Sequence, residues 1–187
     1  MIRRINIFGG PGVGKSTLAA DIYSFLSKAG RPVELVREFV KGWAYDRRRV
    51  DGFENVYTFG QQLREEYRVL KEGPKTGIQL IVTDSPIMLQ VFYSWYYGLP
   101  CEGELLQIAR EFEAKFPSYN VYLPRYAESF LSVGRNETWD EAVALTEDMW
   151  WWLGFWGAEM EVVSEADYRS GFQKTLAKVF KINEENT

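Results

Sequence analysis

An unbroken phosphate-binding motif lies near the start of the sequence. Residues Gly9-Gly10-Pro11-Gly12-Val13-Gly14-Lys15-Ser16 match the pattern G-x-x-x-x-G-K-[ST] at every fixed position. The glycines let backbone N–H groups turn toward phosphate oxygens, and the helix that follows presents its positive end to the same anion. We therefore predict that this loop and the following Thr17 bind the phosphates of ATP or GTP, with Lys15 on the β- and γ-phosphates and the Ser16 hydroxyl on Mg²⁺.

Two carboxylates stand at the ends of apolar runs that have the pattern of buried strands. Asp84 ends the run at 78–84, and Glu38 follows the run at 32–37. Because ligands of parallel sheets bind at the carboxyl ends of the strands, both acids are expected near the phosphates. Asp84 is predicted to hold Mg²⁺ directly or through water, with a helix N-cap as the alternative. Glu38 is predicted to accept or orient the proton of an acceptor hydroxyl, with a solvated loop acid as the alternative.

The composition excludes several kinds of chemistry. The 187 residues include no histidine, which rules out His-based triads, His metal sites and imidazole acid–base catalysis. The single Cys101 cannot form an internal disulfide and fits a reducing cytoplasm. The net charge of −4 argues against a protein that mainly grips nucleic acid without specificity. We expect no membrane span, and no signal peptide before the first strand.

The elements that must position these residues alternate between strand and helix. Strands are predicted at 4–9, 32–37, 78–84, 120–123 and 159–163. Helices are predicted at 15–30, 53–72, 87–97, 103–116, 138–153 and 166–180. This order predicts an α/β fold in one domain over 1–187: a P-loop NTPase three-layer sandwich with a five-stranded parallel sheet and a helical lid at about 125–140.

The order of the motifs resembles the deoxynucleoside and thymidylate kinase superfamily. The shared features are the P-loop, Glu38 with Trp43 after it, the segment F-G-Q-Q-L-R at 59–64, the strand-end acid, and an Arg-containing lid. The segments R-E-F-V-K-G-W-A, I-V-T-D-S-P and V-G-R-N-E-T-W-D-E-A look closer to small bacteriophage P-loop kinases, described as AAA-type ATPases and related to the ribosylnicotinamide kinase domain. A distant subset of phage P-loop kinases phosphorylates 5-hydroxymethyluracil within DNA as a step in base modification, and the resemblance includes that subset among the alternatives for this chain.

The resemblance implies a kinase that uses ATP and Mg²⁺ on a nucleoside-like acceptor, in the cytoplasm, or in that of the host if a phage encodes it. Glu38 would be the catalytic base, and Gln61 or Gln62 would read the edge of a nucleobase. Trp43 and Arg64 would lie on the same acceptor side.

One departure from the resemblance concerns the residue after the strand-end acid. These families usually carry Arg there, and this chain has Ser85. The missing guanidinium favours an acceptor hydroxyl with no phosphate near it. In the lid, Arg135 is predicted to contact the transferring phosphoryl group, and Arg125 is left open between that role and a solvated loop.

Other segments have both a functional and a purely structural interpretation. The run D-R-R-R at 46–49 could hold an acceptor or DNA phosphate, or be a solvated charge run. The aromatic clusters at 92–97 and 150–156 suit base stacking, the core or a homodimer contact. The competing functions are a nucleotide-dependent switch or motor ATPase without an acceptor, and an ATP-binding regulator without turnover.

Overall fold

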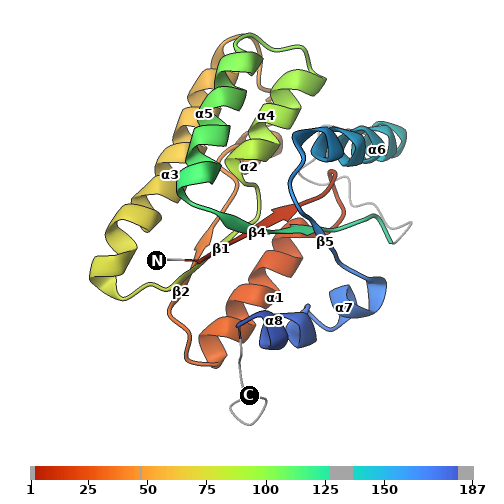
Figure 1. The fold of residues 1–187 in the computed structure, drawn as a ribbon. Coiled ribbons are helices and arrows are strands. Elements are labelled where there is room, and N and C mark those ends of the chain that lie inside the picture. The colour runs from red at the N-terminus through yellow and green to blue at the C-terminus, as the bar shows by residue number, and fades with distance from the viewer. Residues whose placement is uncertain (1–2, 47, 127–136, 181–187) are drawn as a thin grey trace.

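A five-stranded, fully parallel sheet lies at the centre of the molecule, in the strand order β2-β3-β1-β4-β5. The computed structural model describes residues 3–46, 48–126 and 137–180. The strands are β1 (Arg3–Phe8), β2 (Val33–Val36), β3 (Leu80–Thr83), β4 (Ser118–Tyr122) and β5 (Glu161–Val162). Helices cover both faces of this sheet (Figure 1), which confirms the predicted α/β sandwich.

The helices divide between the two faces of the sheet (Figure 1). One face carries α3 (Glu54–Thr76), α4 (Ile87–Tyr96), α5 (Glu102–Lys115) and α6 (Trp139–Trp156). The other carries α1 (Lys15–Lys28), α7 (Glu165–Arg169) and α8 (Gln173–Phe180). Successive side chains of β1 alternate between the two resulting cores, as the period of a strand requires: Phe8 packs with the first group of helices, and Ile5 and Ile7 pack with α1 and α8.

The helices differ most from the prediction at three places. Helix α3 continues past Gly73 and Pro74 and ends at Gly77, whose φ of +86° and N–H bond to the Gly73 carbonyl form the actual stop. The predicted final helix is two helices, because Gly171 and Phe172 both have positive φ between α7 and α8. The short α2 (Lys41–Tyr45) was not predicted, since one helical turn has too few residues to show a period.

Most of the predicted lid, including Arg135, lies outside the described residues. Within the described ranges, no helix is both long and apolar enough to cross a membrane.

Candidate functional site

The phosphate-binding motif forms the turn between β1 and α1. It follows Phe8, the last residue of the central strand, and its last two residues, Lys15 and Ser16, begin α1. Gly14 has a φ of +102°, and a Cβ at Gly10 would lie 1.9 Å from the Thr146 hydroxyl oxygen, so both positions require glycine. The Lys15 ammonium donates to the carbonyl oxygens of Gly9, at 2.8 Å, and Gly10, at 2.9 Å. This is the strand–loop–helix context in which such a loop binds phosphate.

The two strand-end acids lie next to each other, because β2 and β3 are neighbours in the sheet. The Glu38 backbone N–H donates to Asp84 Oδ1 at 2.9 Å. The Ser85 hydroxyl donates to Glu38 Oε1 at 3.4 Å. Asp84 is 4% exposed, and Glu38 is half-buried at the edge of a pocket. One acid thus holds the backbone of the other.

The side chains of Ser16 and Asp84 carry oxygen atoms of the kind that ligates Mg²⁺ in nucleotide sites. The hydroxyl oxygen of Ser16 accepts a bond from the Lys41 ammonium at 2.8 Å, so a cation already lies against it. Mg²⁺ in nucleotide sites takes one or two protein oxygens and completes its shell with phosphate oxygens and water. Ser16 and Asp84 supply such oxygens. Among the residues with described positions, no group of three or more His, Cys, Asp or Glu side chains could hold a metal by itself.

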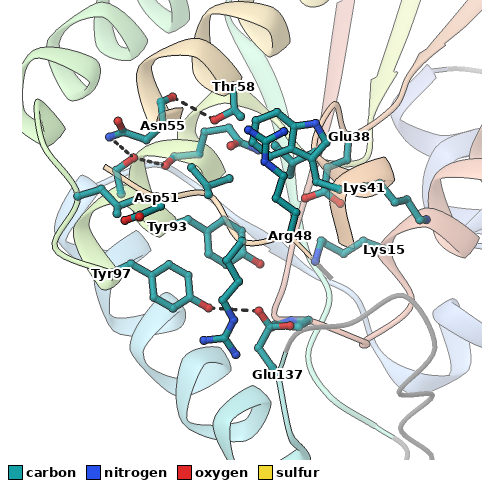
Figure 2. Close-up of a pocket in the computed structure, with 18 residues that line it drawn as sticks. Lys15, Glu38, Lys41, Arg48, Asp51, Asn55, Thr58, Tyr93, Tyr97 and Glu137 are labelled. Atoms are coloured by element: carbon teal, nitrogen blue, oxygen red, sulfur yellow. Dashed lines mark hydrogen bonds between the residues drawn. The ribbon is translucent and has the colours of Figure 1, made fainter. Parts of the chain in front are cut away.

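A pocket of about 590 Å³ opens beside Lys15 and Glu38 (Figure 2). Its walls come from the phosphate loop, from α2 and the segment after it, and from α3 and α4. The lining residues are Pro11, Lys15, Glu38, Val40, Lys41, Trp43, Arg48, Arg49, Val50, Asp51, Asn55, Thr58, Gln90, Tyr93, Ser94, Tyr97, Leu99 and Glu137. Ligand pockets for small molecules have volumes of about 300–1,000 Å³, so this one has room for a nucleoside-sized molecule.

The inner wall of the pocket is polar and ordered by internal hydrogen bonds. The Asn55 side-chain amide donates to the Pro100 carbonyl at 2.6 Å and to the Ser94 hydroxyl at 3.3 Å. Thr58 Oγ1 donates to the Asn55 carbonyl at 3.1 Å. These bonds connect α3 to α4 and keep the wall in one arrangement.

The outer part of the pocket combines rings with cations. Trp43 stacks on Tyr57 with 15° between the ring planes, and the Arg48 guanidinium lies 3.9 Å from the centre of the Trp43 ring. Arg48 also pairs with Glu54. This arrangement places Arg48 and Arg49, which the sequence left open, at the pocket.

The Tyr97 hydroxyl donates to Glu137 at 3.2 Å. Burial, together with the neighbouring Glu137 carboxylate, raises the pKa of Tyr97 well above its usual value. The phenol therefore stays protonated as a hydrogen-bond donor on the pocket wall.

The structure brings Glu38 and Trp43 to the pocket, and Gln61, Gln62 and Arg64 are absent from its lining. Gln62 is fully buried: its Oε1 accepts from the Phe39 N–H at 3.0 Å, and its Nε2 donates to Glu66 at 3.4 Å. The Arg64 side chain is 71% exposed. A role of these three in contacting the acceptor stays a prediction carried by the resemblance.

A buried ionic network lies behind the two acids. Glu66 accepts from the Ile87 N–H at 3.0 Å, and Arg4 donates to Glu66 at 2.7 Å and to Glu113 at 3.0 Å. Burial raises the pKa of Glu66, and the Arg4 guanidinium opposes that shift. Through Gln62 and Ile87, this network holds the backbone on both sides of the site.

Arg125 is attached to the phosphate loop. Its guanidinium donates to the Pro11 carbonyl at 2.6 Å and to the Thr146 hydroxyl at 3.2 Å, and it lies 5.0 Å from the centre of the Trp139 ring. Arg125 is therefore not a solvated loop arginine.

Several pocket residues were not identified from the sequence. Lys41 lies in the segment R-E-F-V-K-G-W-A that carried the resemblance, so its position could have suggested it. Asn55, Thr58 and Gln90 gave no signal, because a polar residue on a helix looks the same whether it faces solvent or a pocket. Tyr93 and Tyr97 were noted only as part of an aromatic cluster.

The fold is similar to that of several solved structures. A NadR protein in complex with NR has a TM-score of 0.66 and 14% identity, and the match covers 97% of this chain and 49% of that one. Deoxyadenosine kinase from M. mycoides with bound dATP has a TM-score of 0.58 and 18% identity, over 95% of this chain and 99% of that one. This chain thus spans about half the length of the NadR protein. At these identities the likeness concerns the fold alone.

The family assignment comes from the sequence. None of the curated proteins matches the chain. A family model described as an AAA domain matches residues 4–168, which include the phosphate loop, both strand-end acids and all of the sheet except Arg3. The chain therefore belongs to this family of AAA-domain proteins.

Proposed function

We propose that this protein is an ATP-dependent kinase that transfers the γ-phosphoryl group to a hydroxyl of a nucleoside-like acceptor. One observation carries the proposal: Lys15 of the phosphate loop and Glu38 line the same pocket of about 590 Å³. A nucleotide whose phosphates lie on the loop would present its γ-phosphate to this pocket. An ATPase that transfers phosphate only to water has no need of such a space.

Each residue near the loop would have one role in the transfer. Lys15 and the loop amides would bind the phosphates, and Ser16 and Asp84 would hold Mg²⁺, which neutralises charge on the phosphate oxygens when bound. Glu38 would accept or align the proton of the acceptor hydroxyl. Its backbone bond to Asp84 supports this role, because it fixes the acid beside the metal-binding carboxylate. Arg135 is proposed as the lid arginine on the transferring group.

The acceptor is proposed to be a free nucleoside or nucleotide, or 5-hydroxymethyluracil within DNA. Trp43 lines the pocket on this side, and the Arg48 guanidinium lies over its ring. Gln61 or Gln62 and Arg64 complete the acceptor side only in a state that differs from the one described, since none of them lines the pocket.

Product analysis with candidate acceptors tests the proposal. The protein is incubated with ATP, Mg²⁺ and either deoxynucleosides, deoxynucleotides, nicotinamide riboside or duplex DNA containing 5-hydroxymethyluracil, and the products are identified by mass spectrometry. We expect ADP and a product heavier by one phosphate only when an acceptor is present. ADP formed equally without any acceptor would instead indicate a switch or motor ATPase, and no ADP under any condition would indicate a nucleotide-binding regulator.

A further inference from the structure

Gln90 is a buried amide on the wall of the pocket. It belongs to α4, its side chain is 6% exposed, and it lines the pocket beside Tyr93 and Ser94. Its Nε2 atom is buried and has no hydrogen-bond partner among the residues that the structure describes. Buried side-chain amides usually have such partners, so this one calls for an explanation.

The other buried polar groups of the same wall have partners. The Asn55 amide bonds to Pro100 and Ser94, and the hydroxyls of Thr58 and Ser94 donate to the backbone carbonyls of Asn55 and Gln90. Hydrogen bonds thus connect the polar groups of this wall, and the Gln90 N–H₂ group takes no part in them. A buried donor without a partner bears the full cost of its desolvation, and a ligand atom that accepts from it removes that cost.

Gln90 also lies next to aromatic rings on one face of α4. Gln90, Tyr93, Ser94 and Tyr97 occur at the i, i+3, i+4 and i+7 spacing of one helix face, and all of them line the pocket. The rings of Tyr93 and Tyr97 are stacked, with 10° between their planes. A donor beside flat rings suits a planar heterocycle with a polar edge.

The residues nearest the phosphate loop lie across the pocket from the α4 wall. Figure 2 shows Lys15, Glu38 and Lys41 on one side, and Asn55, Tyr93 and Tyr97 on the other. An acceptor whose hydroxyl meets Glu38 would therefore direct its ring toward the α4 wall.

We propose that Gln90 determines acceptor specificity by donating a hydrogen bond from Nε2 to a carbonyl oxygen or ring nitrogen at the edge of the acceptor's planar heterocycle. The inference rests on the proposed kinase function, because it concerns the acceptor side of that same pocket. It assigns the reading of the ring to α4, in place of the α3 glutamines that do not line the pocket. A site built to hydrogen-bond one atom of its substrate discriminates strongly against an analogue that lacks it.

Two substitutions at Gln90 test the inference. Gln90→Leu removes the amide at similar size, and Gln90→Glu keeps the shape but presents an oxygen where the N–H₂ group was. Gln107→Leu is the matched control, because Gln107 is exposed on α5, where its amide donates to Glu111 at 3.2 Å. Thermal unfolding shows whether each variant folds, and we expect no loss of stability for Gln90→Leu, since it removes an unpaired buried amide.

Binding and turnover are then measured separately with thymidine, deoxycytidine, deoxyadenosine, deoxyguanosine and nicotinamide riboside. Binding is measured by calorimetry with a non-hydrolysable ATP analogue present. For the acceptor that wild type prefers, we expect both Gln90 variants to weaken binding and lower kcat/KM by about 10- to 100-fold, with the KM for ATP unchanged. Gln107→Leu should match wild type.

The outcomes separate this inference from the proposed function. Folded Gln90 variants that bind and phosphorylate every acceptor as wild type does would overturn the role of Gln90 and leave the kinase proposal standing. An acceptor that binds in a Gln90-dependent way but is never phosphorylated would support the inference and contradict the kinase proposal. If wild type neither binds nor phosphorylates any of these acceptors or hydroxymethylated DNA, both are wrong.

Discussion

The ammonium group of Lys15 lies against the carbonyl oxygens of its own loop, at 2.8 and 2.9 Å. A nucleotide would replace these carbonyls with phosphate oxygens, which carry more negative charge. We therefore expect Lys15→Ala to lower kcat/KM by about 10³-fold or more. Lys15 is half-buried in an open site, so the variant should keep its far-UV circular dichroism and its melting temperature. Wild-type turnover in a folded variant would refute the phosphate-loop assignment.

At Asp84, a substitution can remove the negative charge and keep the hydrogen-bond acceptor. Its Oδ1 accepts the Glu38 N–H, and an asparagine keeps an oxygen acceptor at that position. Asp84→Asn should therefore preserve the fold and raise the Mg²⁺ concentration needed for half-maximal activity by about 10-fold or more, since it removes the negative charge from the proposed metal ligand. A Mg²⁺ titration of activity measures this. An unchanged titration curve would leave Asp84 with only its hydrogen-bonding role.

At the residue scale, the sequence was most informative where the chemistry is local. The phosphate loop depends on eight consecutive residues, so its spacing could be recognised directly. Glu38 and Asp84 could be placed because each follows an apolar strand. Gln90 could not, since its significance depends on the partners that Asn55 and Ser94 already have. Whether a buried amide has a hydrogen-bond partner can be seen only when the positions of all neighbouring side chains are known.

At the element scale, α3 supports the site from behind. Its residue Gln62 accepts the N–H of Phe39, the residue after Glu38, and donates to Glu66 of the same helix. Replacing Gln62 by Leu leaves the Phe39 N–H without its acceptor. We expect the free energy of unfolding to fall by about 1–3 kcal/mol and kcat to fall, while the order of preference among acceptors stays the same. Urea denaturation and the acceptor panel measure the two effects.

The acceptor panel also decides between two roles for Gln62. A change in which acceptor is preferred, at unchanged stability, would show that Gln62 reads the base after all. The sequence could not separate these roles, because Gln62 and Phe39 are far apart along the chain and meet only through packing. The end of α3 was also misplaced from the sequence. Gly73 and Pro74 suggested a stop, whereas Gly77 with its positive φ ends the helix.

At the scale of the whole molecule, one buried arginine joins a central strand to two helices on one face of the sheet. Arg4 of β1 pairs with Glu66 of α3 and Glu113 of α5, and Arg4 and Glu66 are each 1% exposed. Removing one partner of a buried pair leaves an uncompensated charge, so Arg4→Met should lower the free energy of unfolding by about 3–5 kcal/mol. Urea denaturation tests this.

Arg68→Met is the matched control for that substitution. Arg68 is 61% exposed and pairs with Glu65 on the surface of α3. An exposed pair contributes about 0–1 kcal/mol, so this variant should differ little from wild type. Equal effects of the two substitutions would mean that the Arg4 network does not stabilise the fold.

The architecture as a whole was accessible from the sequence because its signals are repeated. Alternating strands and helices predicted the parallel sheet, and T-W-D-E at 138–141 predicted the start of α6, where Thr138 and Glu141 form a capping box. The break between α7 and α8 was missed because Phe172 adopts a positive φ that its residue type does not predict. The network around Arg4 was missed because its partners are more than sixty positions away.

Glu38 is proposed to accept or align the proton of the acceptor hydroxyl, and Glu38→Gln tests this role most directly. Glutamine keeps the size of the side chain and its hydrogen bond with Ser85. It removes the negative charge of the carboxylate, and with it the ability to accept a proton. Phosphate transfer to the acceptor and hydrolysis of ATP by water are measured in the same reaction. We predict that transfer falls by about 10²- to 10⁴-fold, while ATP affinity and hydrolysis change little. Transfer that continues at the wild-type rate, or hydrolysis that falls as far as transfer does, would contradict the claim.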